Sequence, residues 1–543
     1  MRKKVYQRAA AFFMAAAVVI ATAGCGGGNN ANKGTEAGQS SGNTEAGTKA
    51  GTKTGDHDKT KLVVGSAEEP SCFYPTHSSL SPNMKDVPIL ANVYETLVKL
   101  MPDGSREPLL AESWEVSEDG KDYTMHLRKN VTFHNGNEFN AEDVKYTLDT
   151  EAPLSGGQSM LVNYESTEII DDHTVVIHLS DPYGAFLNGL ASRWALIVDK
   201  ETAEEIGEEA YNESPIGTGP YKLVNRVAGD HMELEAYDGY WGGVPSITSV
   251  TYKILSDPNS QILALENGEI DALLDASLSP LLKLSPDSGI TYKTTNAANI
   301  QALSLDCSNG PAKDLNFRKA LQCGINKDDI VQAIYSGQAS TADSYVAPEF
   351  SGHPDEGTYP NVTYDPEKAK KYLEESNYNG EEFKLLTVAG TKNEVAAQVV
   401  QGQLTELGIN CSLNAVDSPT YFNVYMEGDG SGFDGALRAG AVSSLDADCL
   451  YRMFSTEVAA SGGRYNAGIS SPELDELLLA GRTEPDETKR KEIYGKILTV
   501  ISDNALQVPL YYDLSIVAYN SDLNGVVPRP LTGLYFYNEW SWN

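Results

Sequence analysis

Histidine, cysteine and serine side chains could give this chain nucleophilic or metal chemistry, but none of them stands in a recognisable catalytic spacing. The sequence contains no SxxK or HExxH pattern. Its eight histidines are scattered, and His126 and His178 fall in segments that alternate apolar and polar residues, which indicates strand surfaces. The run from Gly217 to Gly219 is no dinucleotide loop, because Pro220 follows where a helix should begin. We predict no catalytic residue, no metal site and no cofactor, and keep an enzyme as the minor alternative.

Cys25 is the residue whose surroundings indicate a chemical modification. A basic start, Arg2 to Arg8, precedes fifteen uncharged residues from Ala9 to Ala23. Such a run suits a signal peptide and is shorter than the ~20 residues of a spanning helix. The small residues before Cys25 resemble a bacterial lipobox, with Thr22 where leucine is usual. We predict a lipoprotein signal peptide over residues 1–24 and an acyl chain such as palmitate on Cys25; the alternative is a plain secretory signal.

The next segment predicts a tether. Residues 26–60 contain no Val, Ile, Leu, Met, Phe, Tyr or Trp, so this segment cannot bury enough apolar surface to fold. We therefore predict a disordered tether over residues 25–60. Signal, cysteine and tether together predict a protein that is lipid-anchored at the extracellular face of the cell membrane, in a Gram-positive bacterium.

Charge and cysteine usage narrow the possible partners. The 543 residues carry a net charge of −35, which argues against a nucleic-acid partner. The length predicts at least two core units. Five cysteines remain beside Cys25, none with zinc spacing; we expect most to be small buried residues and leave one disulfide open. We expect a monomer.

From residue 61 onward the apolar patterns alternate between strand and helix. The segment from Phe383 to Leu413 reads as strand, helix and strand, which predicts a mixed α/β domain with partly parallel pairing. Strands are expected at 62–64, 123–133, 175–179, 250–254, 383–388, 409–413 and 508–512, and helices at 140–148, 258–268, 317–321, 326–337, 365–373, 394–407, 472–480 and 487–502.

Several ordered blocks resemble the family 5 extracellular solute-binding proteins, the dipeptide, oligopeptide and nickel receptors of ABC importers. The resemblance covers nearly the whole chain from about residue 61. The blocks are Ala111–Gly120 with Val131–Gly136 and Asn140–Val144, then Gly217–Tyr221 with Tyr240–Gly243, then Phe317–Leu321 with Ile325–Lys327, and finally Tyr364–Leu373 with Leu407–Ile409.

The resemblance implies a two-lobed periplasmic-binding-protein-like α/β fold (type II, cluster C) with an extra subdomain inserted in lobe one. On this sequence, lobe one would hold residues 61–97, 213–300 and 508–543. The inserted subdomain would hold residues 98–212, and lobe two residues 301–507. Ligand would lie between the lobes and hold them closed, with crossing segments near residues 299–303 and 507–510.

The resemblance also implies two ligand-contacting segments, one in each lobe. Peptide-binding members carry an aspartate that pairs with the ligand's ammonium group, and that position falls on Val442 here. Either the ligand has no free ammonium at this place, or a neighbouring acid, Asp446 or Asp448, replaces the missing one. The ligand-binding residues implied in this way are Glu69, Ser71, Phe73, Tyr74, Arg438, Gly440, Val442 and Asp446.

The function implied is that of a lipid-anchored substrate-binding protein of an ABC transporter. It would capture small peptides or a related solute by cleft closure and deliver them to the permease with its ATPase. Within the family, the alternative is a non-peptide ligand such as an oligosaccharide or a metal chelate.

Overall fold

The computed structural model describes residues 58–427, 432–440, 445–460, 468 and 470–543 of the chain. The predicted signal peptide, Cys25 and nearly all of the predicted tether lie outside these residues, as does Val442. Within the described part, no helix is both long enough and apolar enough to cross a membrane.

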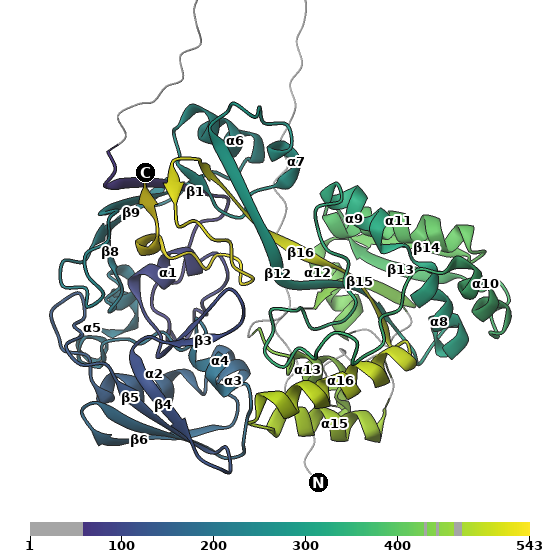
Figure 1. The fold of residues 1–543 in the computed structure, drawn as a ribbon, viewed down its shortest axis with the longest axis horizontal. Helices are drawn as coiled ribbons and strands as arrows, with labels where there is room; N and C mark the ends of the chain where they lie inside the picture. The colour runs from purple at the N-terminus through teal and green to yellow at the C-terminus, as the bar shows by residue number, and fades with distance from the viewer. Residues whose placement is uncertain (1–57, 428–431, 441–444, 461–467, 469) are drawn as a thin grey trace, which may run out of the picture. The chain divides into compact units, whose positions relative to one another are not determined.

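A ten-stranded mixed sheet runs through the described chain, and its two longest strands, β12 and β16, are neighbours within it (Figure 1). Strands β12 and β16 pair antiparallel with each other. In contrast, β1 pairs parallel with β10, and β13 pairs parallel with β14. The sheet confirms the mixed α/β fold. Its order is β14 (Cys411–Val416), β13 (Phe383–Val388), β15 (Gly435–Gly440), β12 (Ile290–Leu305), β16 (Gln507–Asn520), β11 (Ala272–Leu273), β1 (Lys61–Ser66), β10 (Ser249–Ile254), β9 (His231–Ala236) and β8 (Tyr221–Val227).

The predicted inserted subdomain contains a separate antiparallel sheet in the order β4 (Ala111–Val116), β5 (Asp122–Leu127), β7 (Thr174–Leu179) and β6 (Tyr164–Asp171). Every second residue of β5 and β7 is buried, as the alternating pattern predicts. The expected continuation of the first strand to residue 133 is wrong, because Asn130 adopts a left-handed conformation (φ 59°). Val131 and Phe133 are buried on either side of an isolated β-bridge between Thr132 and Glu138. The other elements here are β2 (Val98–Leu100), β3 (Arg106–Pro108), α2 (Ala141–Glu151), α3 (Ser155–Met160), α4 (Phe186–Leu190) and α5 (Lys200–Glu213).

Helices cover the strands of the predicted lobe two. The β13–α11–β14 unit is parallel, as expected, and α11 ends before Gly408, which has a φ of 93°. Asp365 caps α10 by accepting a hydrogen bond from the Lys368 amide, with Pro366 in the first turn. The helices are α8 (Leu315–Gly324), α9 (Lys327–Tyr335), α10 (Pro366–Glu374), α11 (Lys392–Glu406), α12 (Ser418–Phe422), α13 (Cys449–Phe454), α14 (Thr456–Ala460), α15 (Pro472–Thr483) and α16 (Glu487–Asp503).

The buried apolar side chains form separate clusters. One lies within the predicted inserted subdomain and a second around β1, β9 and β10; the largest extends along β12 and β16 into the predicted lobe two. The predicted lobe boundaries remain proposals. The names lobe one, inserted subdomain and lobe two refer to the predicted residue ranges. The remaining elements are α1 (Val87–Val93), α6 (Pro258–Asn267), α7 (Leu278–Leu281), β17 (Leu523–Asn524) and β18 (Ser541–Trp542).

Candidate ligand-binding site

Strands β12 and β16 both run across the predicted boundary between lobe one and lobe two, and their pairing is interrupted near it. The register between them shifts between Asn296 and Ile300, and again between Gln301 and Ala302. The second shift lies opposite Pro509, which has no N–H for the ladder. Beyond the first shift β12 pairs with β15 as well as with β16. Bulged, partly unpaired backbone of this kind is where two strands can bend.

A buried carboxylate, Asp513, joins these strands to lobe two. It accepts hydrogen bonds from Gln301 Nε2 (2.8 Å) and the Tyr335 hydroxyl (2.9 Å), and pairs with Lys392 Nζ (2.8 Å). Burial opposes the charge on Lys392, but the Asp513 carboxylate outweighs it and raises the pKa of that ammonium group. From β16, the Asp513 carboxylate thus contacts side chains of β12, α9 and α11.

Arg438 lies on β15 beside a row of aromatic rings. Its Nη1 donates to the Tyr425 hydroxyl (2.8 Å), and the guanidinium lies 5.1 Å from the centroid of that ring. The Tyr425 ring in turn stacks on those of Tyr421 and Phe433, with centroids 5.8 and 5.4 Å away. Gly440, on the same strand, pairs with Ile300 of β12. The structure therefore brings Arg438 and Gly440 next to the crossing strands.

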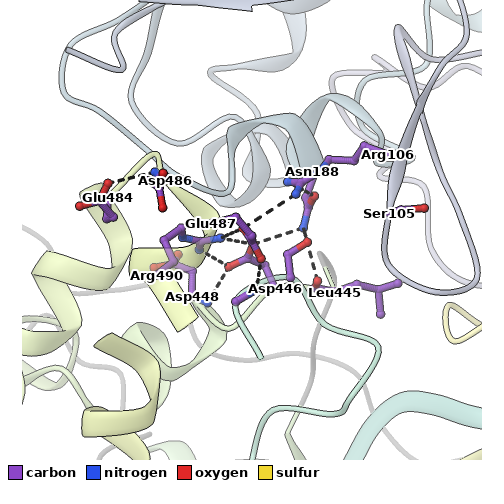
Figure 2. A network of polar contacts seen from close by, with 12 residues as sticks. Ser105, Arg106, Asn188, Leu445, Asp446, Asp448, Glu484, Asp486, Glu487 and Arg490 are labelled. Atoms are coloured by element: carbon purple, nitrogen blue, oxygen red, sulfur yellow. Dashed lines mark hydrogen bonds and ion pairs between the residues drawn. The ribbon is translucent and has the colours of Figure 1, made fainter. Parts of the chain in front are cut away.

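Asp446 lies in a buried network between lobe two and the inserted subdomain (Figure 2). Its carboxylate receives two hydrogen bonds from Arg490, from Nη2 at 2.6 Å and from Nη1 at 3.1 Å, and both side chains are 0% exposed. From the inserted subdomain, Asn188 Nδ2 donates to Asp446 Oδ2 (3.3 Å) and to the Leu445 carbonyl (3.3 Å). Arg106 Nη1 donates to the Asn188 side-chain oxygen (3.1 Å).

Asp448 makes a second contact between the same two parts of the chain. The Tyr183 hydroxyl, from the inserted subdomain, donates to Asp448 Oδ2 (3.0 Å), and Arg482 Nη1 lies 3.8 Å from that oxygen. Burial raises the pKa of Asp448 to about 6, although Arg482 opposes this shift. Its Oδ1 has no hydrogen-bond partner among the described residues.

The four predicted ligand residues of lobe one are held by lobe one and by the inserted subdomain, since the Phe73 and Tyr74 amides donate to Asn212 and the Tyr74 ring packs against Tyr211. Glu69 accepts from the Gly229 amide, and the Ser71 amide donates to Asp86. Phe73 and Tyr74 are 1% and 2% exposed and belong to the apolar core. The contacts give Phe73 and Tyr74 a packing role, and no described contact joins any of these four residues to Arg438, Gly440 or Asp446; their ligand role stays a prediction.

Neither a candidate metal cluster nor a disulfide is found among the described residues. No group of three or more His, Cys, Asp or Glu side chains among them could hold a metal ion. The five described cysteines are all free thiols, so the disulfide left open by the sequence is not formed between them; they are Cys72, Cys307, Cys323, Cys411 and Cys449.

Comparison with known proteins decides the family. The model of the bacterial extracellular solute-binding proteins, family 5 (middle), matches residues 106–462, more than half of the chain. The chain belongs to this family. Family 5 proteins are extracellular or periplasmic transport receptors that deliver solutes to ABC permeases, so the enzyme alternative is set aside.

Individual relatives match this family 5 protein over most of its length. The dipeptide-binding protein of Escherichia coli K12 is 28% identical over 512 residues, 88% of this chain and 94% of the relative. Among solved structures, the ABC transporter substrate-binding protein CtaP of Listeria monocytogenes has a TM-score of 0.80 at 25% identity, over 90% of this chain and 100% of that one. NikZ of Campylobacter jejuni, in complex with Ni(L-His), has a TM-score of 0.72 at 25% identity, over 89% and 99%.

The sequence interpretation missed four residues that shape the site of this family 5 protein. Asp513 was detectable as an acid within an apolar strand, Leu510 to Val517. Arg490 was detectable because it shares a helix face with Tyr494 and Ile497. Asn188 and Tyr183 gave no signal, since their partners lie 258 and 265 residues further along the chain.

Proposed function

We propose that this family 5 protein captures a small peptide, or a related solute, by closing its two lobes and delivers it to an ABC permease. The observation that carries the proposal is the contact between Asn188 and Asp446, because it joins the inserted subdomain to lobe two at a buried position. Lobes that meet through such contacts and are linked by two bulged strands suit a hinge motion that a bound ligand would stabilise.

The similarity to a dipeptide-binding protein over 88% of this chain supports a peptide ligand. The second candidate is a non-peptide solute, an oligosaccharide or a metal chelate, and the structural similarity to a Ni(L-His) complex favours the chelate. Mass spectrometry of the compound released when the purified protein is denatured would decide between them. A released peptide supports the proposal, and a chelate or sugar in stoichiometric amount would refute the peptide assignment.

The described contacts bear on the ligand's amino end. Val442 supplies no carboxylate, and Asp446 already receives two hydrogen bonds from Arg490 and one from Asn188. Turning Asp446 toward a ligand would leave the Arg490 guanidinium buried without its partner, which is strongly unfavourable. We therefore propose that the ligand presents no free ammonium group at this place.

Calorimetry with a bound peptide and its N-acetylated form would test this step. Acetylation should change the affinity by no more than about threefold, because no buried carboxylate would lose a partner. Asp448→Asn is the informative variant, since Asp448 has an oxygen without a partner, and Asp446→Asn is the control for structural damage. A loss of about a hundredfold on acetylation, reproduced by Asp448→Asn, would show that Asp448 binds the ligand's ammonium.

The proposed location of the protein is the outer face of the cell membrane. Acylated Cys25 would hold the protein at the extracellular face of the cell membrane of a Gram-positive bacterium, and residues 25–60 would let the lobes reach the permease. The proposed unit is a monomer, with lobe one at residues 61–97, 213–300 and 508–543, the inserted subdomain at 98–212 and lobe two at 301–507.

A further inference from the structure

A cavity of about 80 Å³ lies between lobe one and the inserted subdomain. Helix α1, the segment that leaves α4 and the segment from Leu531 to Asn538 form its walls, and none of its lining residues comes from 301–507. It is therefore separate from the crossing strands and from the Asp446 network. Its wall is mainly apolar, with Leu90, Ala91, Tyr94, Leu196, Leu531 and Leu534 among the lining residues.

Arg193 lines this cavity and is a cation without an ion-pair partner among the described residues. Its Nε donates to the Pro82 carbonyl (2.9 Å), its Nη1 lies 3.3 Å from the Met84 sulfur, and its guanidinium lies 3.6 Å from the centroid of the Trp194 ring. No carboxylate of the described residues lies within ion-pair distance of it. Burial lowers the pKa of Arg193 to about 10, with Asp86 opposing the shift from further away. A half-buried cation without a carboxylate partner attracts an anion.

The other charged groups of the cavity already have partners. Lys99 pairs with Glu539 at 2.5 Å and lies over the Phe536 ring. The buried carboxylate of Glu95 accepts hydrogen bonds from Thr218, Tyr240 and Trp241 at 2.9 to 3.0 Å. Arg193 is thus the lining cation that remains for a ligand.

We infer that this cavity binds a monocarboxylate with a short branched aliphatic tail. A water molecule needs about 10–15 Å³ of such volume, so the cavity holds about five to eight waters or an apolar group of four or five carbons. The tail would displace water from the leucine-lined wall, and the carboxylate would pair with Arg193, away from the already satisfied Glu95. The same chemistry occurs in a free acid and in a peptide that ends in leucine.

Calorimetry on the full chain tests this site with 4-methylpentanoate, and with 4-methylpentan-1-ol as the uncharged control. The acid should bind, and the alcohol should bind at least about tenfold more weakly because it gives Arg193 no charge. Arg193→Gln should weaken binding of the acid about tenfold. Arg226→Gln is the matched control, since Arg226 also lies over an aromatic ring, that of Phe73 at 4.9 Å, but does not line the cavity.

Leu534→Trp is a second variant, which keeps Arg193 and fills the cavity. It should also weaken binding of the acid. Glycyl-leucine identifies the source of the carboxylate: if it binds in an Arg193-dependent way and the free acid does not, the site takes a peptide's carboxyl end. Failure of both compounds to bind, or binding that neither Arg193→Gln nor Leu534→Trp changes, would overturn the inference. The proposal does not depend on the solute bound between the lobes.

Discussion

Replacing Arg490 by methionine should destabilise the fold because it leaves the Asp446 carboxylate buried without its cation. Arg490 is 0% exposed and donates to both oxygens of Asp446, at 2.6 and 3.1 Å, and through Nε to the Gly481 carbonyl at 3.2 Å. Breaking a buried pair by removing one partner costs about 3–5 kcal/mol. That is a large part of the ~5–15 kcal/mol that stabilises a typical native protein.

Urea unfolding at pH 7, followed by tryptophan fluorescence and circular dichroism, measures this loss. Lys370→Met is the matched control, because Lys370 pairs with Glu367 at 3.2 Å while both side chains are more than half exposed. That surface pair should contribute about 0–1 kcal/mol. An Arg490→Met protein with the wild-type midpoint and slope would refute the reasoning, since a desolvated pair cannot be lost at no cost.

The double variant Asp446→Leu, Arg490→Met separates loss of the pair from loss of packing. Because it removes the uncompensated charge, it should recover more than half of the stability that Arg490→Met loses. A double variant that loses the sum of the two single effects would show that the two side chains act independently.

Three further outcomes follow from the sequence and the structure. Cys25→Ser should release the protein into the medium with its fold intact, and a variant that remains on the membrane would contradict acylation. Small-angle scattering should show compaction when a ligand binds, and identical curves with ligand bound would contradict closure. Burial raises the pKa of Glu151 from 4.5 to about 8, so the folded state retains that proton. The associated stability is present below about pH 4.5 and is lost as the pH rises through 8, and Glu151→Gln should flatten this part of the profile of Tm against pH.

Local chemistry made much of the fold predictable. Asp365 and Pro366 mark the start of α10, and Asn140 forms a capping box with Asp143 at the start of α2. These signals lie within a few residues of the structure that they determine. In contrast, β12 was not predicted as a strand of sixteen residues, because its first half is mostly half-buried without alternation while its last six residues are all buried. Its length is set by pairing with β16, more than 200 residues away.

The candidate site was less predictable for the same reason. The sequence identified Asp446 as an acid near the ligand segment, but its partners Arg490 and Asn188 are 44 and 258 residues away. Phe73 and Tyr74 were selected by resemblance, and the structure buries both rings in a core shared by lobe one and the inserted subdomain. Position along the chain could not reveal this burial, because the Tyr74 ring packs against Tyr211, from the far end of the inserted subdomain.

The place of β16 in the central sheet has a consequence for the order of folding. β16 pairs with β11 in lobe one and with β12 on both sides of the interrupted region, and Trp542 donates a hydrogen bond to the Lys61 carbonyl. Synthesis runs from the N-terminus, so neither lobe has its full sheet until residues 507–543 have been made. Contacts of such long sequence separation form slowly. The chain therefore lacks its native tertiary structure until late in its synthesis. That state suits the export of an extracellular or periplasmic protein, and we expect chaperones to bind the unfinished chain.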